Sequence, residues 1–122
     1  MKNVIAVIIT GTVLTISGFA AQANGTLTNK EVMQLTASAK TPEEHMRLAR
    51  HFQAKADKLE AEAKEHADMA RNYRANPTAS KTKRPGASDT ASHCETLSQD
   101  LAKAARDARA LAADHEAMAK QQ

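Results

Sequence analysis

The chain has 122 residues, 17 of them basic and 14 acidic, and its net charge of +3 is too small for the clustered basic face of a nucleic-acid-binding protein. Two phenylalanines, one tyrosine and no tryptophan leave too few rings to stack on bases. This length allows one small domain, and a single cysteine excludes an internal disulfide bond. The abundance of Ala, Glu, Lys, Arg and Leu is typical of long helices.

Residues 1–23 have the pattern of a cleavable secretory signal peptide. Lys2 provides the positive start, 4–19 form an apolar run, and 21–23 are an Ala-x-Ala cleavage site. The run is about as long as a membrane span, so an uncleaved anchor is the alternative interpretation. Its glycines and threonines and the cleavage site favour removal. We therefore expect a periplasmic or secreted chain that begins at Asn24, with no stable membrane insertion after cleavage.

Residues 24–40 contain the start of a short helix. Thr28 and Glu31 have the spacing of a capping box, in which each side chain accepts a hydrogen bond from the other residue's backbone. Leu27 and Val32 flank this box as a hydrophobic staple. The pattern predicts a helix that ends near residue 39.

A stronger helix start follows at Thr41. Pro42 occupies the first helical position, and Glu44 completes a second capping box. No glycine or proline interrupts the chain before Pro77, so we expect one long helix over about 42–74. It is roughly 50 Å long at 1.5 Å per residue.

The segment 76–90 has the composition of a linker, with prolines, a glycine and several serines and threonines. A third capping box, Ser92 with Glu95, predicts a second long helix over about 92–120. Ser88 or Asp89 could begin the helix earlier.

Both long helices carry apolar residues at heptad spacing, which predicts that they pack along one seam. Large residues beside alanines allow close antiparallel packing. On the first helix the rows are His45, Phe52, Leu59, His66 and Tyr73, with Ala49, Ala56, Ala63 and Ala70. On the second they are Cys94, Leu101, Ala108 and His115, with Leu97, Ala104, Leu111 and Met118.

The repeats also predict how the two helices align. The favoured register pairs His45 with His115, Phe52 with Ala108, Leu59 with Leu101 and His66 with Cys94. A slip of one turn is the alternative. The predicted fold is all-α: an antiparallel helical hairpin over 41–122, an alanine-rich coiled coil preceded by the short helix. Because the seam has few large side chains, two hairpins could pair into a four-helix bundle.

In this register, histidine, methionine and cysteine form two polar layers. One layer, near the linker, comprises His66, Met69, His93 and Cys94; the other, at the far end, comprises His45, Met46, His115 and Met118. Imidazole with thioether or thiolate suits copper(I) and other soft metals such as silver, and imidazole with thiolate suits zinc. With Ser92 as the cap, Cys94 lies in the first helical turn, where the helix dipole favours the thiolate.

An ordinary structural role explains the same residues. Histidine at the edge of a core often only forms hydrogen bonds, methionine at helical spacing is usually core filler, and Cys94 can be a small buried apolar group. Neither a Cys-x-x-Cys nor a His-Glu-x-x-His motif is present in the sequence. His51 lies off the heptad rows, so we expect it to be exposed.

The chain resembles two groups of known proteins. The pairs His66/Met69 and His115/Met118 are similar to the His-x-x-Met pairs of periplasmic silver- and copper-binding helical proteins. More broadly, the chain resembles small exported bacterial helical-hairpin proteins of no assigned function, which implies an exported hairpin and no chemistry. The stretches that carry this resemblance are Thr41-Pro42-Glu43-Glu44-His45, Glu65-His66-x-x-Met69-Ala70, His93-Cys94 and Asp114-His115-x-x-Met118-Ala119.

These features favour a protein without catalytic activity. A thin hairpin offers no concave pocket with converging groups. Cys94 beside His66 or His93 lacks a third orienting group and an oxyanion site. We expect an exported helical protein that acts through self-association, as a homodimer, or through an envelope partner. The alternative is a periplasmic binding protein for copper, silver or zinc that uses the two layers.

Overall fold

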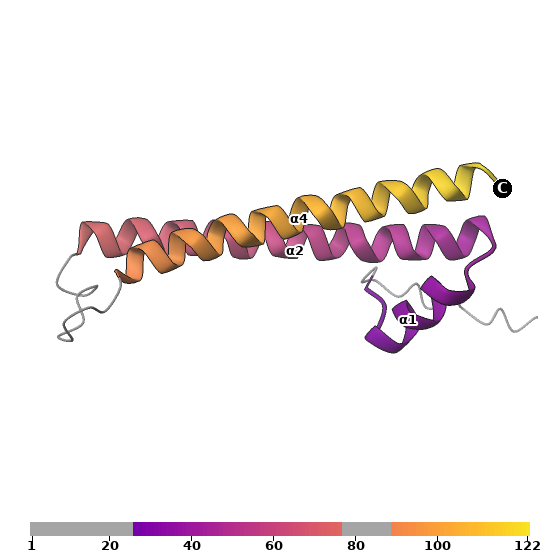
Figure 1. Ribbon diagram of the computed structural model, residues 1–122, viewed down its shortest axis with the longest axis horizontal. Helices are drawn as coiled ribbons and strands as arrows, with labels where there is room; N and C mark the ends of the chain where they lie inside the picture. The colour runs from indigo at the N-terminus through magenta and orange to yellow at the C-terminus, as the bar shows by residue number, and fades with distance from the viewer. Residues whose placement is uncertain (1–25, 77–88) are drawn as a thin grey trace, which may run out of the picture.

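The computed structural model describes residues 26–76 and 89–122, which form the helices α1 (Asn29–Ser38), α2 (Pro42–Ala75) and α4 (Thr90–Lys120). The two long helices run antiparallel and side by side, and α1 lies against the first half of α2 (Figure 1). The prediction of an all-α hairpin with a short N-terminal helix is confirmed. The predicted signal peptide and most of the predicted linker lie outside the described residues.

Both N-terminal capping boxes form as their sequence spacing predicts. The Thr28 hydroxyl accepts a hydrogen bond from the Glu31 backbone N–H, and Glu31 accepts one from the Thr28 backbone N–H. Thr41 and Glu44 make the same exchange at the start of α2, where Pro42 takes the first position. These contacts satisfy backbone donors that have no partner within the helix.

Helix α4 begins earlier than the capping box of Ser92 and Glu95 predicted, at the alternative start beside Asp89. The helix begins at Thr90, two residues before Ser92, and Asp89 is its cap, with its carboxylate 3.0 Å from the Ala91 backbone nitrogen. An aspartate cap is at least as good as serine, and its charge complements the positive end of the helix dipole. Cys94 therefore lies beyond the first turn of α4, and not within it as predicted.

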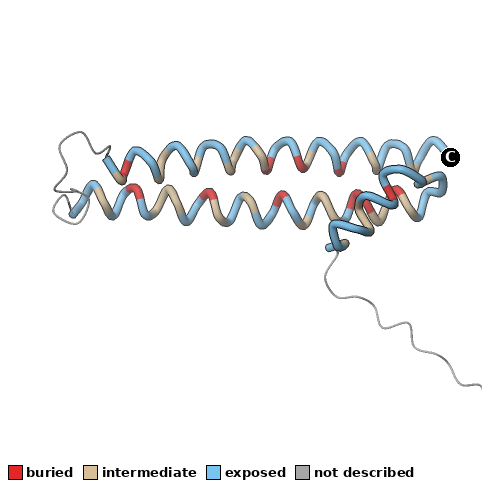
Figure 2. Tube along the Cα trace, turned by 60° about the horizontal axis from the view of Figure 1, so that its bottom comes forward, coloured by how far each residue is buried: buried red, intermediate tan, exposed pale blue. Residues whose placement is uncertain are grey.

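Alanines form most of the buried interface between α2 and α4. Along both helices the buried positions face the partner helix (Figure 2). The buried apolar residues of the described chain are Leu35, Leu48, Ala49, Ala56, Ala63, Ala70, Ala91, Ala105, Ala108 and Ala112. Since only two of these are larger than alanine, the hairpin buries few large side chains.

The prediction of the second row on α4 is wrong. Leu97, Leu111 and Met118 are 44%, 45% and 43% exposed, and the row that faces α2 instead contains Ala91, Ser98, Ala105 and Ala112. Both choices alternate with the Cys94 row at heptad spacing, so periodicity does not separate them. The smaller residues face inward because they let α4 approach the alanines of α2 closely.

Contacts at two heights confirm the predicted register. At the far end, the Nδ1 atoms of His45 and His115 lie 3.2 Å apart. Nearer the linker, the Ser98 hydroxyl donates a 2.7 Å hydrogen bond to the Ala63 backbone carbonyl. The two pairs agree with one continuous alignment, so a slip of one turn is excluded.

Ion pairs join the two long helices along one side of the seam. Arg74 pairs with Glu95, and Arg109 pairs with Glu60 and lies 3.5 Å from Asp57. These residues flank the rows that contain Ala63 and Ser98. This side of the hairpin is therefore polar, and exposed ion pairs of this kind contribute little to stability.

Candidate functional site

The most specific polar contact between the long helices joins His45 and His115. His45 lies in the first turn of α2 and is only 7% exposed, whereas His115 is half-buried near the end of α4. The ring centroids are 5.5 Å apart and the ring planes differ by 25°. The centroid distance exceeds the 3.2 Å Nδ1–Nδ1 distance by about one ring radius on each side. The rings therefore meet head to head, and one Nδ1–H donates to the other Nδ1.

Phe52 fixes the plane of the His115 ring. Their ring planes are within 4° of parallel and their centroids are 5.8 Å apart. On its other flank, Phe52 meets His51 edge to face, with centroids 5.2 Å apart. Offset parallel and edge-to-face arrangements are the favourable geometries for such rings. A row of rings therefore holds His115 in place from the α2 side.

The prediction that His51 is exposed is wrong, because its side chain binds the N-terminal segment. Its Nδ1 accepts a 3.0 Å hydrogen bond from the Leu27 backbone N–H, and its side chain is half-buried. A 3.9 Å ion pair between Arg47 and Glu31 lies nearby. No local signal in the sequence announces this contact, because its partner lies 24 residues away and is a backbone group.

Burial sets the protonation of two of these histidines. Burial lowers the pKa of His115, the neighbouring His45 lowers it further, and Asp114 acts in the opposite direction. Burial also lowers the pKa of His51, with a smaller contribution from Lys55. Both rings therefore favour the neutral state, which the Nδ1 acceptor of His51 requires.

The linker-end layer is less closely assembled. His66 has a buried Nδ1 with no hydrogen-bond partner among the described residues, and the common register places Cys94 on the facing turn of α4. Cys94 is half-buried and free, whereas His93 is exposed and Met69 is 36% exposed. Within the described ranges, no three His, Cys, Asp or Glu side chains form a group that could hold a metal ion.

The predicted far-end layer therefore yields one close pair. His45 and His115 meet, Met46 is half-buried one residue after His45, and Met118 is 43% exposed one turn beyond His115. The sequence prediction did not use Phe52 or His51 in this layer. Phe52 could have been included, because it belongs to the same heptad row as His45.

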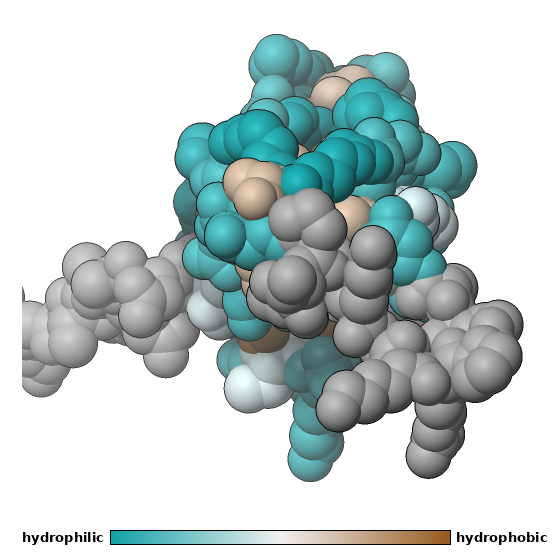
Figure 3. All heavy atoms as spheres, turned by 90° about the vertical axis from the view of Figure 1, so that its left-hand side faces the viewer, coloured by the Kyte–Doolittle hydropathy of each residue, from teal (hydrophilic) through white to brown (hydrophobic). Residues whose placement is uncertain are grey.

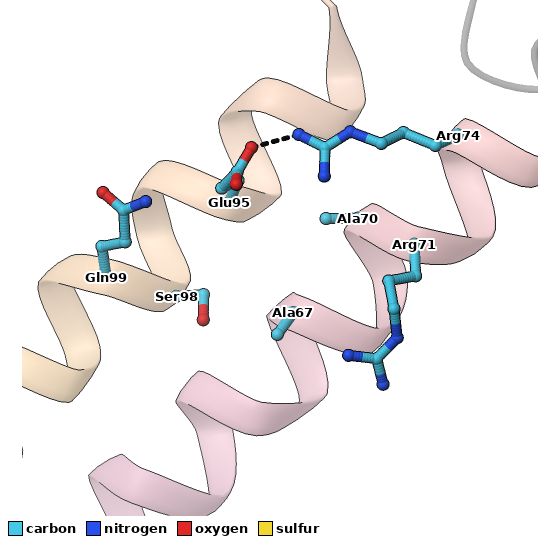
Figure 4. A pocket seen from close by; sticks show the side chains of 7 residues that line it. All are labelled: Ala67, Ala70, Arg71, Arg74, Glu95, Ser98 and Gln99. Atoms are coloured by element: carbon cyan, nitrogen blue, oxygen red, sulfur yellow. Dashed lines mark hydrogen bonds and ion pairs between the residues drawn. The ribbon is translucent and has the colours of Figure 1, made fainter.

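A shallow groove of about 300 Å³ lies on the polar side near the linker end of the hairpin. It is lined by Ala67, Ala70, Arg71, Arg74, Glu95, Ser98 and Gln99 (Figure 4). Both arginines are already paired, Arg74 with Glu95 across the groove and Arg71 with Asp68. The groove therefore presents no unpaired arginine to a ligand. Seen end-on from the linker end of the hairpin, the surface of the described residues is mainly hydrophilic, with isolated apolar patches (Figure 3).

An apolar face runs along the opposite side of the hairpin. It consists of Leu97, Leu111 and Met118 on α4, together with Met69 on α2, and each side chain is at least 36% exposed. Each of these residues follows a seam position of the His45 and His115 rows by one turn, so all four flank the same side of the seam. The ion pairs between the long helices therefore lie on one side of the seam, and these exposed apolar side chains lie on the other, where the same row of α2 also carries Lys55 and Glu62.

Comparison with known proteins gives no family for this chain. No protein-family model, curated protein or solved structure matches it. The resemblances drawn from short stretches of its sequence stay predictions. In the described part of the chain, no helix combines the length and the apolar character needed to cross a membrane.

Proposed function

We propose that this chain is an exported, non-catalytic helical protein that acts by association, and that its partner is a second copy of itself. The observation that carries this proposal is the apolar face, in which Leu97, Leu111 and Met118 are each exposed by more than two fifths. Side chains of this size at heptad spacing normally lie inside a helical interface. Here the alanine row of α4 occupies that interface, which leaves the larger row outward.

The dimensions of the face are compatible with a dimer of hairpins. From residue 97 to residue 118 it extends about 30 Å, and two helices side by side are about 20 Å wide. This side of the hairpin, with its polar and apolar residues together, therefore measures roughly 600 Å² before side-chain relief, which is of the same order as the about 800 Å² that each partner buries in a standard interface. Two such faces related by a two-fold axis would form a four-helix bundle.

The modest core of the single hairpin also supports association. Leu35 and Leu48 are the only buried apolar side chains larger than alanine among the described residues. Small domains with little buried apolar area commonly gain stability from oligomerisation. The second copy would supply the large apolar contacts that the alanine seam does not.

Sedimentation velocity over micromolar to millimolar concentrations tests this proposal. We expect a concentration-dependent dimer for the natural chain and a monomer for Leu111→Lys, which places a charge within the apolar face. Ala113→Lys is the matched control, because Ala113 is exposed on the same helix, away from that face, and the added charge is identical. A natural chain that is monomeric at every concentration, or equal dimerisation of the two variants, would contradict the proposal.

A further inference from the structure

The contact between His45 and His115 has the spacing of a chelating ligand pair. Bonds from zinc to imidazole nitrogen are about 2.0–2.1 Å long, so two nitrogens of a tetrahedral site lie roughly 3.3–3.4 Å apart. The two Nδ1 atoms are 3.2 Å apart, within about 0.2 Å of that value. The helices therefore need not move apart for both nitrogens to bind one ion.

We propose that His45 and His115 bind one late divalent transition-metal ion, such as Zn²⁺, through their Nδ1 atoms. Two imidazoles supply two of four positions, and water completes the site on the half-buried side of His115. This site links the first turn of α2 to the end of α4. It is independent of the apolar face and of the dimer proposed above.

Ion binding needs a rearrangement of protons but no net loss of one at neutral pH. In the metal-free contact, one ring carries a hydrogen on Nδ1 and donates it to the other ring. When the metal binds, that hydrogen moves to Nε2 of the same ring through solvent, so both Nδ1 lone pairs become ligands. Each ring also tilts so that its lone pair points to a common position beside the N–N line.

The surroundings of the pair favour a cation. Asp114 lies close enough to His115 to oppose the lowering of its pKa, and His45 lies close enough to Glu44 to lower the pKa of that carboxyl. Phe52 lies parallel to the His115 ring and limits its motion. Two carboxylates therefore act electrostatically on the histidine pair, and Phe52 keeps the His115 ring in its plane. Imidazole nitrogen selects zinc, nickel and copper over the oxygen-seeking ions Mg²⁺ and Ca²⁺.

Native mass spectrometry and thermal unfolding of the purified chain with ZnCl₂ test the proposal. We expect one Zn²⁺ per chain and a rise in Tm of roughly 11–22 °C when zinc reaches about a hundred times its Kd, because the ion binds only the folded arrangement. MgCl₂ at the same concentration should give no adduct and no rise. Zinc binding should weaken as the pH falls, because protons compete with zinc for the imidazole nitrogens.

His115→Gln is the decisive variant, because this side chain is half-buried and glutamine keeps much of its volume. It should bind Zn²⁺ at least about tenfold more weakly, since even outer residues of metal sites change affinity by that factor. His93→Gln is the matched control and should keep the adduct, because His93 is exposed near the opposite end of α4. Circular dichroism without metal confirms that each variant is folded.

A spectroscopic measurement on the natural chain keeps the proposal testable if His115→Gln fails to fold. With one equivalent of Cu²⁺, electron paramagnetic resonance should show coordination by two imidazole nitrogens. The absence of an adduct, equal zinc affinity in His115→Gln and the natural chain, or an adduct abolished by His66→Gln instead would each overturn the proposal.

Discussion

Replacing Ala105 by leucine tests whether the alanines hold the two long helices close together. Ala105 is 1% exposed and lies in the row of α4 that faces α2. A leucine there adds three carbons. If the seam had room, their burial would stabilise the hairpin by about 2 kcal/mol at about 0.8 kcal/mol per carbon. If the seam is closely packed, the extra volume forces the helices apart and destabilises it by about 1–3 kcal/mol.

We expect destabilisation by about 2 kcal/mol, which corresponds to a fall in Tm of roughly 8–16 °C for a domain of this size. Ala110→Leu is the control, because Ala110 is exposed on the same helix and leucine is nearly as good a helix former as alanine. Thermal unfolding followed by circular dichroism, at one fixed protein concentration, compares the two variants. A Tm for Ala105→Leu equal to or above that of Ala110→Leu would refute close alanine packing.

Three further predictions concern stability. The pKa values of His115 and His51 are lowered from 6.5, so the unfolded chain binds protons more readily than the folded chain. The stability from these groups is therefore complete above about pH 6.5 and is lost as the pH falls toward the folded-state pKa values. Between pH 7.5 and 5.5, the free energy of unfolding in urea should fall less in His115→Gln than in the natural chain. Thr41→Ala should destabilise the chain by about 1 kcal/mol through loss of the α2 cap, whereas Thr96→Ala, at an exposed position within α4, should change the unfolding free energy by less than about 0.5 kcal/mol. Leu48→Ala, at a fully buried side chain, should reduce the free energy of unfolding in urea by about 2–5 kcal/mol; a loss below 1 kcal/mol would contradict its place in the core.

The sequence predicted features that depend on neighbouring residues. Each N-terminal capping box involves residues only three apart, and no glycine or proline interrupts the chain between Pro42 and Pro77. Helices α1 and α2 form where these signals place them. The pairing of His45 with His115 was also predicted, because the heptad repeats of two stiff helices allow few alignments. Local signals and periodicity therefore suffice for the hairpin and for the one contact between His45 and His115.

The inward row of α4 could not be predicted from periodicity. Leu97 and Ala105 belong to alternative rows that alternate equally well with the Cys94 row. Burying leucine maximises apolar area, whereas burying alanine minimises the distance between helices. The choice depends on the opposite helix, where Ala56 and Ala63 already form a flat surface. The contact of His51 with Leu27 escaped prediction for a related reason, since it depends on how α1 packs against α2.

Because the alanine row of α4 faces α2, the larger apolar side chains remain available to a second copy, and they set the expected strength of the dimer. Six apolar side chains of each copy are exposed or half-buried on the apolar face or beside it: Leu59, Met69, Leu97, Leu101, Leu111 and Met118. Covering the exposed part of each contributes about 1 kcal/mol, or roughly 10–12 kcal/mol for two copies. Loss of translational and rotational freedom opposes association by at least about 4 kcal/mol. The balance of about 6–8 kcal/mol corresponds to a Kd between micromolar and millimolar. Because this range is weak, the dimer should dissociate on dilution, and Leu111→Lys should move its Kd beyond the millimolar limit.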